Sequence, residues 1–327
     1  PAISGSWRVK EESFLRSVKD INDLKIRAGV GVTGNIPGTT NLYFEKVGPT
    51  GNYLWLDGEF VQPWGIASNV NENLRWEKKT EYNLGIDGEF FNSKLSATLD
   101  GYYRNTTDLL WEYEMPQPPY PFGTMWDNHG QIENYGVEMA VNGNVFKNSD
   151  WKIDAGIVAA WNRNMVTRIT SGYTKGKEGA NSPYLNVGYL SGDGLTGVNI
   201  MRLEEGKPIG NFYGYKFIRI NEEGKMVYER LNAAGDVIGE TTSTSSSVNM
   251  QVIGNAQPLV TGGFNVNVSY KQFDLTANFR GQIGGKIFNF KRFYYENKNI
   301  NLENYLLSAF EGDAAKLTTD DRVFSDF

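Results

Sequence analysis

The chain contains no cysteine and a single histidine, His129, among its 327 residues. The lack of cysteine excludes disulfides, thiolate zinc sites, iron–sulfur ligation and cysteine nucleophiles. One histidine leaves little room for a zinc site built on imidazoles or for a charge-relay system. We therefore expect no cofactor, no metal and no enzymatic activity.

Excess basic charge and long apolar runs are also missing. The 32 Lys and Arg residues stand against 38 Asp and Glu, for a net charge of −6, so the basic footprint of a nucleic-acid-binding protein is absent. The longest apolar run, residues 155–161, is far shorter than the roughly 20 residues of a membrane-spanning helix. Mean hydropathy alone, at −0.45, predicts a soluble protein. Residues 1–7 show no initiator Met and no signal-peptide pattern, so we expect a piece of a longer protein.

Glycine and aromatic residues are abundant, with 37 Gly, 18 Tyr, 18 Phe and 8 Trp. Apolar and polar residues alternate with period 2 along most of the chain, which is typical of strands that are buried on one face. Tight turns at 92–93, 147–150 and 271–272 join three pairs of such segments into hairpins. The eight predicted strands begin near residues 3, 24, 76, 95, 135, 151, 260 and 273.

The connections between these strands alternate in length. Short turns stand on one side, and the long stretches 35–74, 110–130, 167–256 and 287–327 stand on the other. This asymmetry is typical of an outer-membrane β-barrel. Because the strands on both sides of 167–256 end on the long-loop side, that segment contributes zero or two barrel strands. We favour zero, with 209–217 and 225–229 forming a local sheet inside a large loop.

Aromatic residues bracket the tight turns, where a membrane interface is expected to lie. Trp151 and Trp161 share a strand face ten residues apart, which at a tilt near 40° separates them by roughly 25 Å, the height of an apolar band. In a soluble protein this spacing would be a coincidence. The predicted interface girdle consists of Phe90, Phe91, Phe146, Trp151, Trp161, Tyr270 and Phe273.

Catalytic and phosphate-binding motifs are weak. The pattern G-x-G-x-x-G at 29–34 is followed by Asn-Ile-Pro-Gly rather than by the start of a helix, and 281–286 is one residue short of a P-loop. Adjacent carboxylates such as Glu11 and Glu12 point apart in extended chain. For His129, beside Asp127, we expect a solvated loop residue.

The most distinctive segment is 110–130, in which four prolines limit conformational freedom. Its aromatic side chains offer flat apolar faces with polar tips, which suit sugar rings, peptides or a partner protein. A self-packed loop cap is an equally good interpretation. The candidate substrate or partner contacts are Trp111, Tyr113, Tyr120, Phe122 and Trp126.

Several segments together resemble the SusC/RagA-type TonB-dependent outer-membrane transporters, in the order of that family. They are LKIRAGVGVTGN at 24–35, NLRWEKKTEYNLGID at 73–87, NYGVE at 134–138, GKPIGNFYGY at 206–215, GNAQP at 254–258 and FDLTANFRG at 273–281.

This resemblance implies an all-β fold: a transmembrane antiparallel barrel of 22 strands with long extracellular loops and short periplasmic turns. Residues 1–327 would be a fragment of that single barrel domain, strands 12 to 19, with the plug domain and TonB box upstream and three strands downstream. It further implies the outer membrane of a Gram-negative bacterium, outer-membrane lipid around the barrel, a SusD-like surface lipoprotein as partner, coupling to TonB, and import of an oligosaccharide or oligopeptide.

One segment departs from the family pattern. Many members carry an acidic, calcium-like stretch before the Gly-Asn-x-x-Pro motif, whereas residues 231–239 here read LNAAGDVIG, so we expect no metal there. The alternative to a transporter is a secreted β-rich adhesin or carbohydrate-binding module. In that case the apolar strand faces would pack against a second sheet and leave no continuous apolar belt.

Overall fold

The computed structural model describes residues 1–35, 42–49, 51, 53–169, 184–190, 199–296 and 304–317. It divides into two compact units. The first consists of Pro1–Tyr184, Glu204–Lys207 and Val260–Gln282, and the second of Leu185–Leu203, Pro208–Leu259 and Ile283–Phe327.

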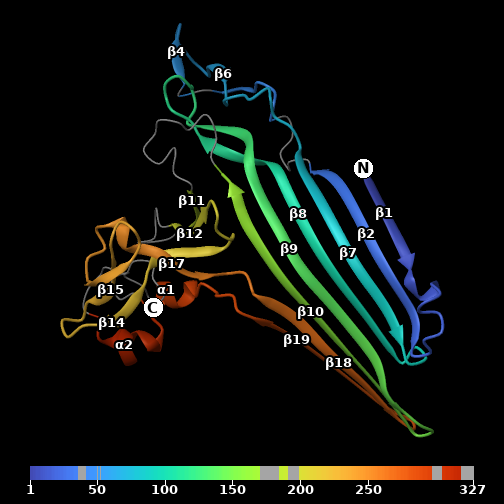
Figure 1. The fold of residues 1–327 in the computed structure, drawn as a ribbon. Coiled ribbons are helices and arrows are strands. Elements are labelled where there is room, and N and C mark those ends of the chain that lie inside the picture. The colour runs from blue at the N-terminus through green and yellow to red at the C-terminus, as the bar shows by residue number, and fades with distance from the viewer. Residues whose placement is uncertain are drawn as a thin grey trace. The chain divides into compact units, whose positions relative to one another are not determined.

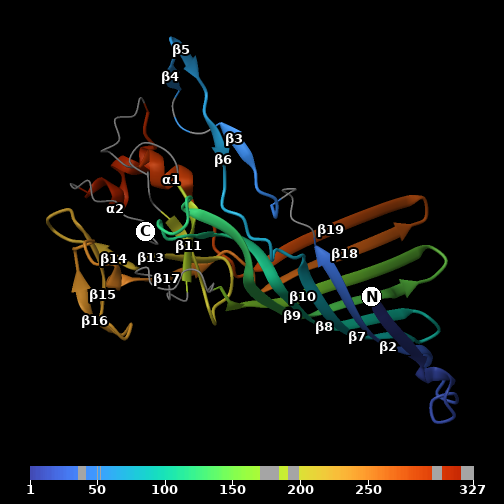
Figure 2. The ribbon, with the colours of Figure 1, turned by 90° about the horizontal axis from the view of Figure 1, so that it is seen from above.

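One eight-stranded sheet dominates the first unit, with strands in the order β1-β2-β7-β8-β9-β10-β18-β19 (Figure 1, Figure 2). The number of strands agrees with the sequence-based prediction. The sheet is open, because β1 and β19 lie at its two edges. Its strands are β1 (Ala2–Arg8), β2 (Ile21–Asn35), β7 (Glu77–Phe90), β8 (Leu95–Glu114), β9 (Thr124–Lys147), β10 (Trp151–Arg168), β18 (Val260–Tyr270) and β19 (Phe273–Ile283).

Strands β10 and β18 pair directly and antiparallel, from Trp151 opposite Tyr270 to Trp161 opposite Val260. The long segment between them therefore inserts no strand at this position of the sheet, as expected from the parity of the connections. The tight turns are also confirmed: Phe91, Asn92 and Ser93 have φ of 56–58° and Lys271 has φ of 52°, left-handed conformations that reverse a chain within a few residues.

The prediction that residues 110–130 form a loop is wrong at both ends of that segment. The β8–β9 ladder continues from Leu110 opposite Asn128 to Glu114 opposite Thr124, so only residues 115–123 connect the two strands. The alternation breaks at the polar run 105–108, where the β8–β9 register also shifts, and it returns at Trp111, Tyr113 and Met115. Because of this break, the sequence pattern placed the end of the strand before residue 110.

Two small ribbons lie between β2 and β7. Strand β3 (Val47–Pro49) pairs with β6 (Trp64–Ile66), and β4 (Leu54–Leu56) pairs with β5 (Glu59–Val61). Asp57 and Gly58 close the inner ribbon with φ of 51° and 89°. An Asp-Gly pair with two positive φ angles is the favoured two-residue turn of a β-hairpin.

The described part of the second unit contains two sheets. Ile200, Phe212 and Ile253 form a small core in the four-stranded sheet β11-β12-β13-β17, whereas Tyr215 of that sheet packs with Met226 and Tyr228 of the three-stranded sheet β14-β15-β16. The local strands expected in 209–217 and 225–229 are confirmed, although they belong to different sheets. The elements are β11 (Tyr184–Tyr189), β12 (Asn199–Glu204), β13 (Asn211–Tyr215), β14 (Phe217–Ile220), β15 (Met226–Leu231), β16 (Val237–Thr241), β17 (Met250–Asn255), α1 (Phe290–Tyr295) and α2 (Gly312–Ala315).

The described residues also include three short 3-10 helices, Val9–Glu11, Ser247–Asn249 and Leu307–Phe310. Within the described ranges, no helix is both long and apolar enough to span a membrane.

Candidate functional site

The two faces of the large sheet differ sharply in chemistry, because neighbouring rows of side chains point to opposite sides. One row across β2, β7, β8 and β9 consists of Ile26, Ile86, Leu99 and Met139, and the last three are exposed. The next row consists of Arg27, Gly85, Asp100 and Glu138. We call the first side the apolar face and the second the polar face.

An ionic network crosses three strands on the polar face. Arg27 Nε donates to Asp87 Oδ2 at 2.7 Å, and Arg27 Nη2 donates to Asp100 Oδ2 at 3.1 Å. Lys25 Nζ lies 3.1 Å from Asp87 Oδ2, and Thr98 Oγ1 donates to Asp87 Oδ1 at 3.2 Å. These side chains are about one third exposed or less, apart from Lys25, so water screens the network only in part.

Gly85 leaves the space that the Arg27 guanidinium occupies. A Cβ at residue 85 would lie 2.4 Å from Asp100 Oδ1 and 2.7 Å from Arg27 Nη2. Both distances are shorter than any real Cβ contact, so the ionic network requires glycine at this position.

A second charged group lies nearer the loop end of the same face. Glu81 lies 3.2 Å from Lys79 Nζ and 3.1 Å from Arg104 Nε, and the Arg104 guanidinium covers the ring of Tyr102 at 4.2 Å from its centroid. The polar face is thus paired and hydrogen-bonded across β7 and β8, as expected for a surface that meets water rather than lipid.

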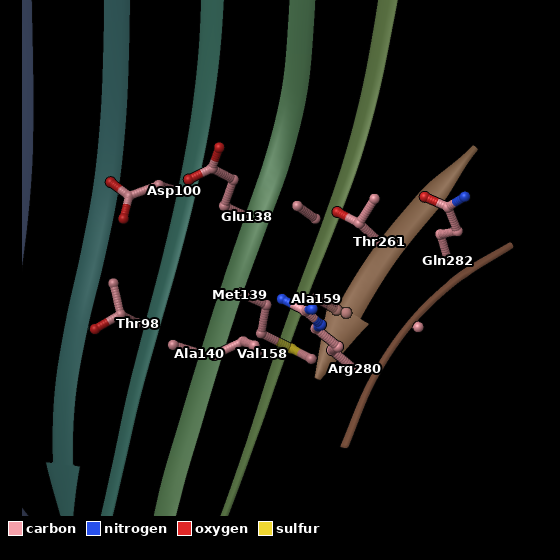
Figure 3. A pocket seen from close by; sticks show the side chains of 13 residues that line it. Thr98, Asp100, Glu138, Met139, Ala140, Val158, Ala159, Thr261, Arg280 and Gln282 are labelled. Atoms are coloured by element: carbon pink, nitrogen blue, oxygen red, sulfur yellow. The ribbon is translucent and has the colours of Figure 1, made fainter. Parts of the chain in front are cut away.

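A pocket of about 680 Å³ opens on the polar face between β8 and β19 (Figure 3). Asp100 and Glu138 come from neighbouring strands at one side of it, and Arg280 and Gln282 come from β19 at the other. The strands between β8 and β19 contribute mainly small side chains to the pocket. The remaining residues that line it are Thr98, Met139, Ala140, Val158, Ala159, Ala160, Thr261, Gly262 and Gly281.

The charged groups of this pocket are not all satisfied by the protein. Asp100 is bound to Arg27, whereas no hydrogen bond or ion pair involves the side chain of Glu138 or Arg280 within the described residues. The pocket therefore presents an unpaired carboxylate, an unpaired guanidinium and neutral hydrogen-bonding groups. Such a surface offers charge-assisted hydrogen bonds to a polar solute.

The predicted aromatic contacts split into two groups. Tyr113 is 3% exposed and packs with Met115, Met125 and Tyr120, so the expectation that its ring is available at the surface is wrong. Burial raises the pKa of the Tyr113 hydroxyl, which lies at the loop end of β8, beyond the apolar face. The self-packed interpretation therefore holds for this part of the segment.

The other three candidates keep part of their surface in water. Trp111 is 45% exposed, and Phe122 and Trp126 are half-buried. Asn69 Nδ2 donates to the carbonyl oxygen of Phe122 at 2.6 Å, and Asn71 Nδ2 donates to that of Trp126 at 3.2 Å. The stretch before β7 is thus hydrogen-bonded to the backbone of Phe122 and Trp126, and the contact role of the three aromatic side chains stays a prediction.

His129 does not lie in a solvated loop. It is part of β9, and its Nε2 lies 3.0 Å from Oδ2 of Asp127, which is 6% exposed. Asp127 Oδ1 also accepts hydrogen bonds from Asn71 Nδ2 at 2.9 Å and from the Asn128 amide at 2.8 Å. The histidine belongs to a structural network that joins β9 to the stretch before β7.

The predicted girdle residues other than Trp161 lie close to the tight turns, whereas Trp161 lies ten residues beyond Trp151 along β10. Trp151 and Tyr270 are paired in register with ring centroids 4.3 Å apart, and Trp161 lies 5.9 Å from Tyr135. A bulge in β9, between the pairs Asn144–Asp154 and Phe146–Ile153, brings Phe146 onto the apolar face. Phe91, Phe146 and Phe273 are exposed, and Phe90 is half-buried beside the first turn. Their function as an interface girdle stays a prediction.

Sequence reasoning missed the ionic network and the pocket. Both depend on which residue of one strand faces which residue of the next. For one such pair the register could be read from the sequence, because the tight turn at 92–93 places Asp87 opposite Thr98. Arg27 and Glu138 come from strands joined by long connections, and their register was not readable from the sequence.

A sheet of long antiparallel strands, apolar on one face and charged on the other, is typical of the wall of a transmembrane β-barrel. The family described as TonB dependent receptor-like, beta-barrel, matches residues 1–300. The chain belongs to this family, whose members are transporters of the Gram-negative outer membrane rather than enzymes. Family membership thereby confirms the expected fold class, location and lack of enzymatic activity.

Two relatives are similar to this chain over most of its length. TonB-dependent receptor SusC of Bacteroides thetaiotaomicron is 29% identical over 303 residues, 88% of this chain and 28% of the relative. TonB-dependent receptor P3 of Formosa agariphila is 28% identical over 302 residues, 89% of this chain and 28% of the relative. The chain thus spans less than a third of the length of these relatives.

Solved structures show the same fold. The RagAB peptide transporter matches 98% of this chain and 34% of its own with a TM-score of 0.77 and 23% identity. The RagAB peptide importer in the closed-closed state matches 90% of this chain and 30% of its own with a TM-score of 0.74 and 25% identity.

Proposed function

We propose that this chain is part of the barrel wall of an outer-membrane importer that is energised through TonB and works with a SusD-like surface lipoprotein. The observation that carries the proposal is the division of one sheet into an exposed apolar face and a charged face with a pocket of about 680 Å³. The apolar face lies against lipid, and the charged face lines the interior through which the solute passes. Residues 1–327 are a fragment of one barrel domain.

The transported solute is an oligopeptide or an oligosaccharide. The unpaired Glu138 and Arg280 suit a solute with both an ammonium and a carboxylate group, and the RagAB neighbour of 25% identity is described as a peptide importer. These two points support the oligopeptide.

The adhesin alternative needs a second sheet over the apolar face, whereas Leu84 and Ile157 are 57% and 49% exposed.

Uptake by cells that carry the full-length transporter tests this function. Radiolabelled oligopeptide and oligosaccharide mixtures are supplied to these cells, to cells without the gene, and to cells without TonB. Uptake of one mixture should require both the gene and TonB. Uptake that is the same in all three strains contradicts the proposal.

Two variants of pocket residues test whether the transported solute passes through the pocket. Glu138→Gln and Arg280→Gln should slow uptake without changing the amount of transporter in the outer membrane. Asp274→Asn is the matched control, because Asp274 lies on the same strand as Arg280 and outside the pocket. If all three variants transport at the wild-type rate, the pocket is not part of the path.

A further inference from the structure

The apolar face of the large sheet is hollowed between β1 and β9. The hollow, which we call the apolar groove, has a volume of about 910 Å³ and is lined mainly by apolar side chains. Its floor contains small residues, because Gly5, Ala28 and Gly101 lie in one row across β1, β2 and β8. A Cβ added to Gly5 or Gly101 would lie no closer than 4.0 Å to any atom beyond the chain neighbours. The groove therefore has room for an apolar group that comes from outside the sheet.

The groove ends at a pair of tyrosine rings on the side of the long connections. Tyr82 and Tyr103 both line it, and their ring centroids lie 6.3 Å apart. From the tight turn up to this pair, the described positions of the apolar face on β2, β7 and β8 carry no charged side chain. Tyrosine combines an apolar ring with a polar hydroxyl and is enriched where the bilayer core meets water. The groove thus lies inside the apolar band, with its tyrosine end at the boundary.

Lys78 stands on the same face of β7, four residues beyond Tyr82. It lies opposite Gly34 and Thr107, and the two-residue period of a strand puts its side chain on the side of Tyr82. At about 3.3 Å per residue and a tilt near 40°, Lys78 lies about 30 Å above Phe90, where β7 ends, and so just past an apolar band of roughly 25 Å. Its side chain is exposed, and no hydrogen bond or ion pair involves it within the described residues.

Arg163 repeats this arrangement on β10. It lies twelve residues beyond Trp151, hence at the same height of about 30 Å, and its guanidinium carbon is 5.8 Å from the ring centroid of Trp161. No carboxylate pairs with it in the part of the chain that the structure describes. On the polar face, by contrast, Lys25 and Arg104 each lie 3.1 Å from a carboxylate oxygen. Cations that the chain leaves unpaired at headgroup height suit the phosphate of a lipid.

We propose that the apolar groove and Lys78 together bind one phosphorylated lipid of the outer leaflet, the lipid A part of lipopolysaccharide. One acyl chain lies in the groove, and a headgroup phosphate pairs with the Lys78 ammonium. The leaflet is the outer one, because the long connections of an outer-membrane barrel face the cell exterior. This binding site is separate from the import path, and it rests on the proposed function only through the contact of the apolar face with lipid.

A second copy of this chain fits the same surface less well. Two copies in one membrane are related by an axis along the membrane normal, so equivalent residues lie at equal heights. A contact through the groove would therefore bring Lys78 and Arg163 of one copy to the height of the same cations on the other, and like charges that face each other cost free energy. A lipid phosphate neutralises these charges instead.

Native mass spectrometry of the full-length transporter counts the bound lipid. The protein is purified in detergent with phosphatidylcholine and mixed with lipid A, or with the same lipid A after removal of its phosphate groups. The wild type should retain about fivefold more of the phosphorylated form, and Lys78→Gln should lose that preference. Lys94→Gln is the matched control, because Lys94 is an exposed lysine at the tight-turn end of the same hairpin. Glu133→Gln removes a negative charge from the loop end of the apolar face and should not lower binding.

A third variant tests the groove itself. Gly101→Leu fills its floor and should lower the retention of both lipid forms, with unchanged heat-modifiable mobility of the barrel. Undiminished retention in this variant overturns the groove as the binding site. If Gly101→Leu does not fold, the comparison of Lys78→Gln with the wild type still decides.

Two further results overturn the inference. One is equal retention of the two lipid forms by the wild type, or an unchanged preference in Lys78→Gln. The other is a wild-type species of twice the mass that Gly101→Leu converts into single copies, which means that a second copy covers the groove. Neither result bears on the uptake experiment, which tests import separately.

Discussion

At the scale of single residues, neighbours on one strand face different solvents. Leu84 lies on the apolar face opposite Ala28 and Gly101, and Asn83 lies on the polar face opposite Gly29 and Tyr102. Leu84→Arg should destabilise the full-length barrel by about 2–4 kcal/mol, because it places a charge near the bilayer midplane. Thermal unfolding in lipid vesicles measures this change. Asn83→Arg is the matched control, and an equal loss at both residues would contradict the assigned faces.

Gly85 gives a second prediction at this scale. Gly85→Ala forces the Arg27 guanidinium or the Asp100 carboxylate to move and should cost about 1–3 kcal/mol, the range for overpacking of a filled site. Gly101→Ala is the control, since the nearest atom to its added Cβ is a backbone oxygen at 4.0 Å. The two unfolding midpoints are compared in the same vesicles. A Gly101 variant that loses as much stability as the Gly85 variant would show that the ionic network is not the cause.

At the scale of elements, what the sequence could predict depends on local pattern. Alternation predicted all eight strands of the sheet, and short polar turns predicted its hairpins. The ends of β8 and β9 were missed, because the polar run at 105–108 interrupts the alternation, whereas the backbone ladder resumes after a bulge and continues to Glu114. The contact of Arg27 with Asp87 and Asp100 was missed for a different reason, since register across long connections is set by tertiary packing.

The stretch before β7 is held to the β8–β9 hairpin by asparagine side chains. Asn71 is 5% exposed and donates to Asp127 Oδ1 at 2.9 Å, while its own Oδ1 accepts from the Asn73 amide at 3.0 Å. Asn71→Ala leaves buried partners unsatisfied and should lower the local opening free energy of residues 67–76 by about 1–3 kcal/mol. Hydrogen exchange of that stretch measures it. Asn73→Ala, which removes an exposed side chain, should leave exchange unchanged, and faster exchange in both variants would contradict the role of Asn71.

At the scale of the whole molecule, the family and the sheet together fix an orientation that can be measured. The tight turns face the periplasm and the long connections face the cell exterior, since outer-membrane barrels place short turns inside and long loops outside. The absence of cysteine from this chain makes single-cysteine labelling a direct probe. Glu59→Cys lies in β5, in the long connection between β2 and β7, and Gln272→Cys lies in the tight turn between β18 and β19, so the two residues are on opposite sides of the sheet's connections.

A membrane-impermeant maleimide applied to intact cells should label Glu59→Cys in the full-length transporter and leave Gln272→Cys unlabelled. Disruption of the outer membrane should make Gln272→Cys reactive, because the turn is exposed once the reagent reaches the periplasm. The unsubstituted transporter gives the background from cysteines outside this chain. Labelling of Gln272→Cys in intact cells would place the tight turns on the cell surface. The long connections would then face the periplasm, where no surface lipoprotein could reach them.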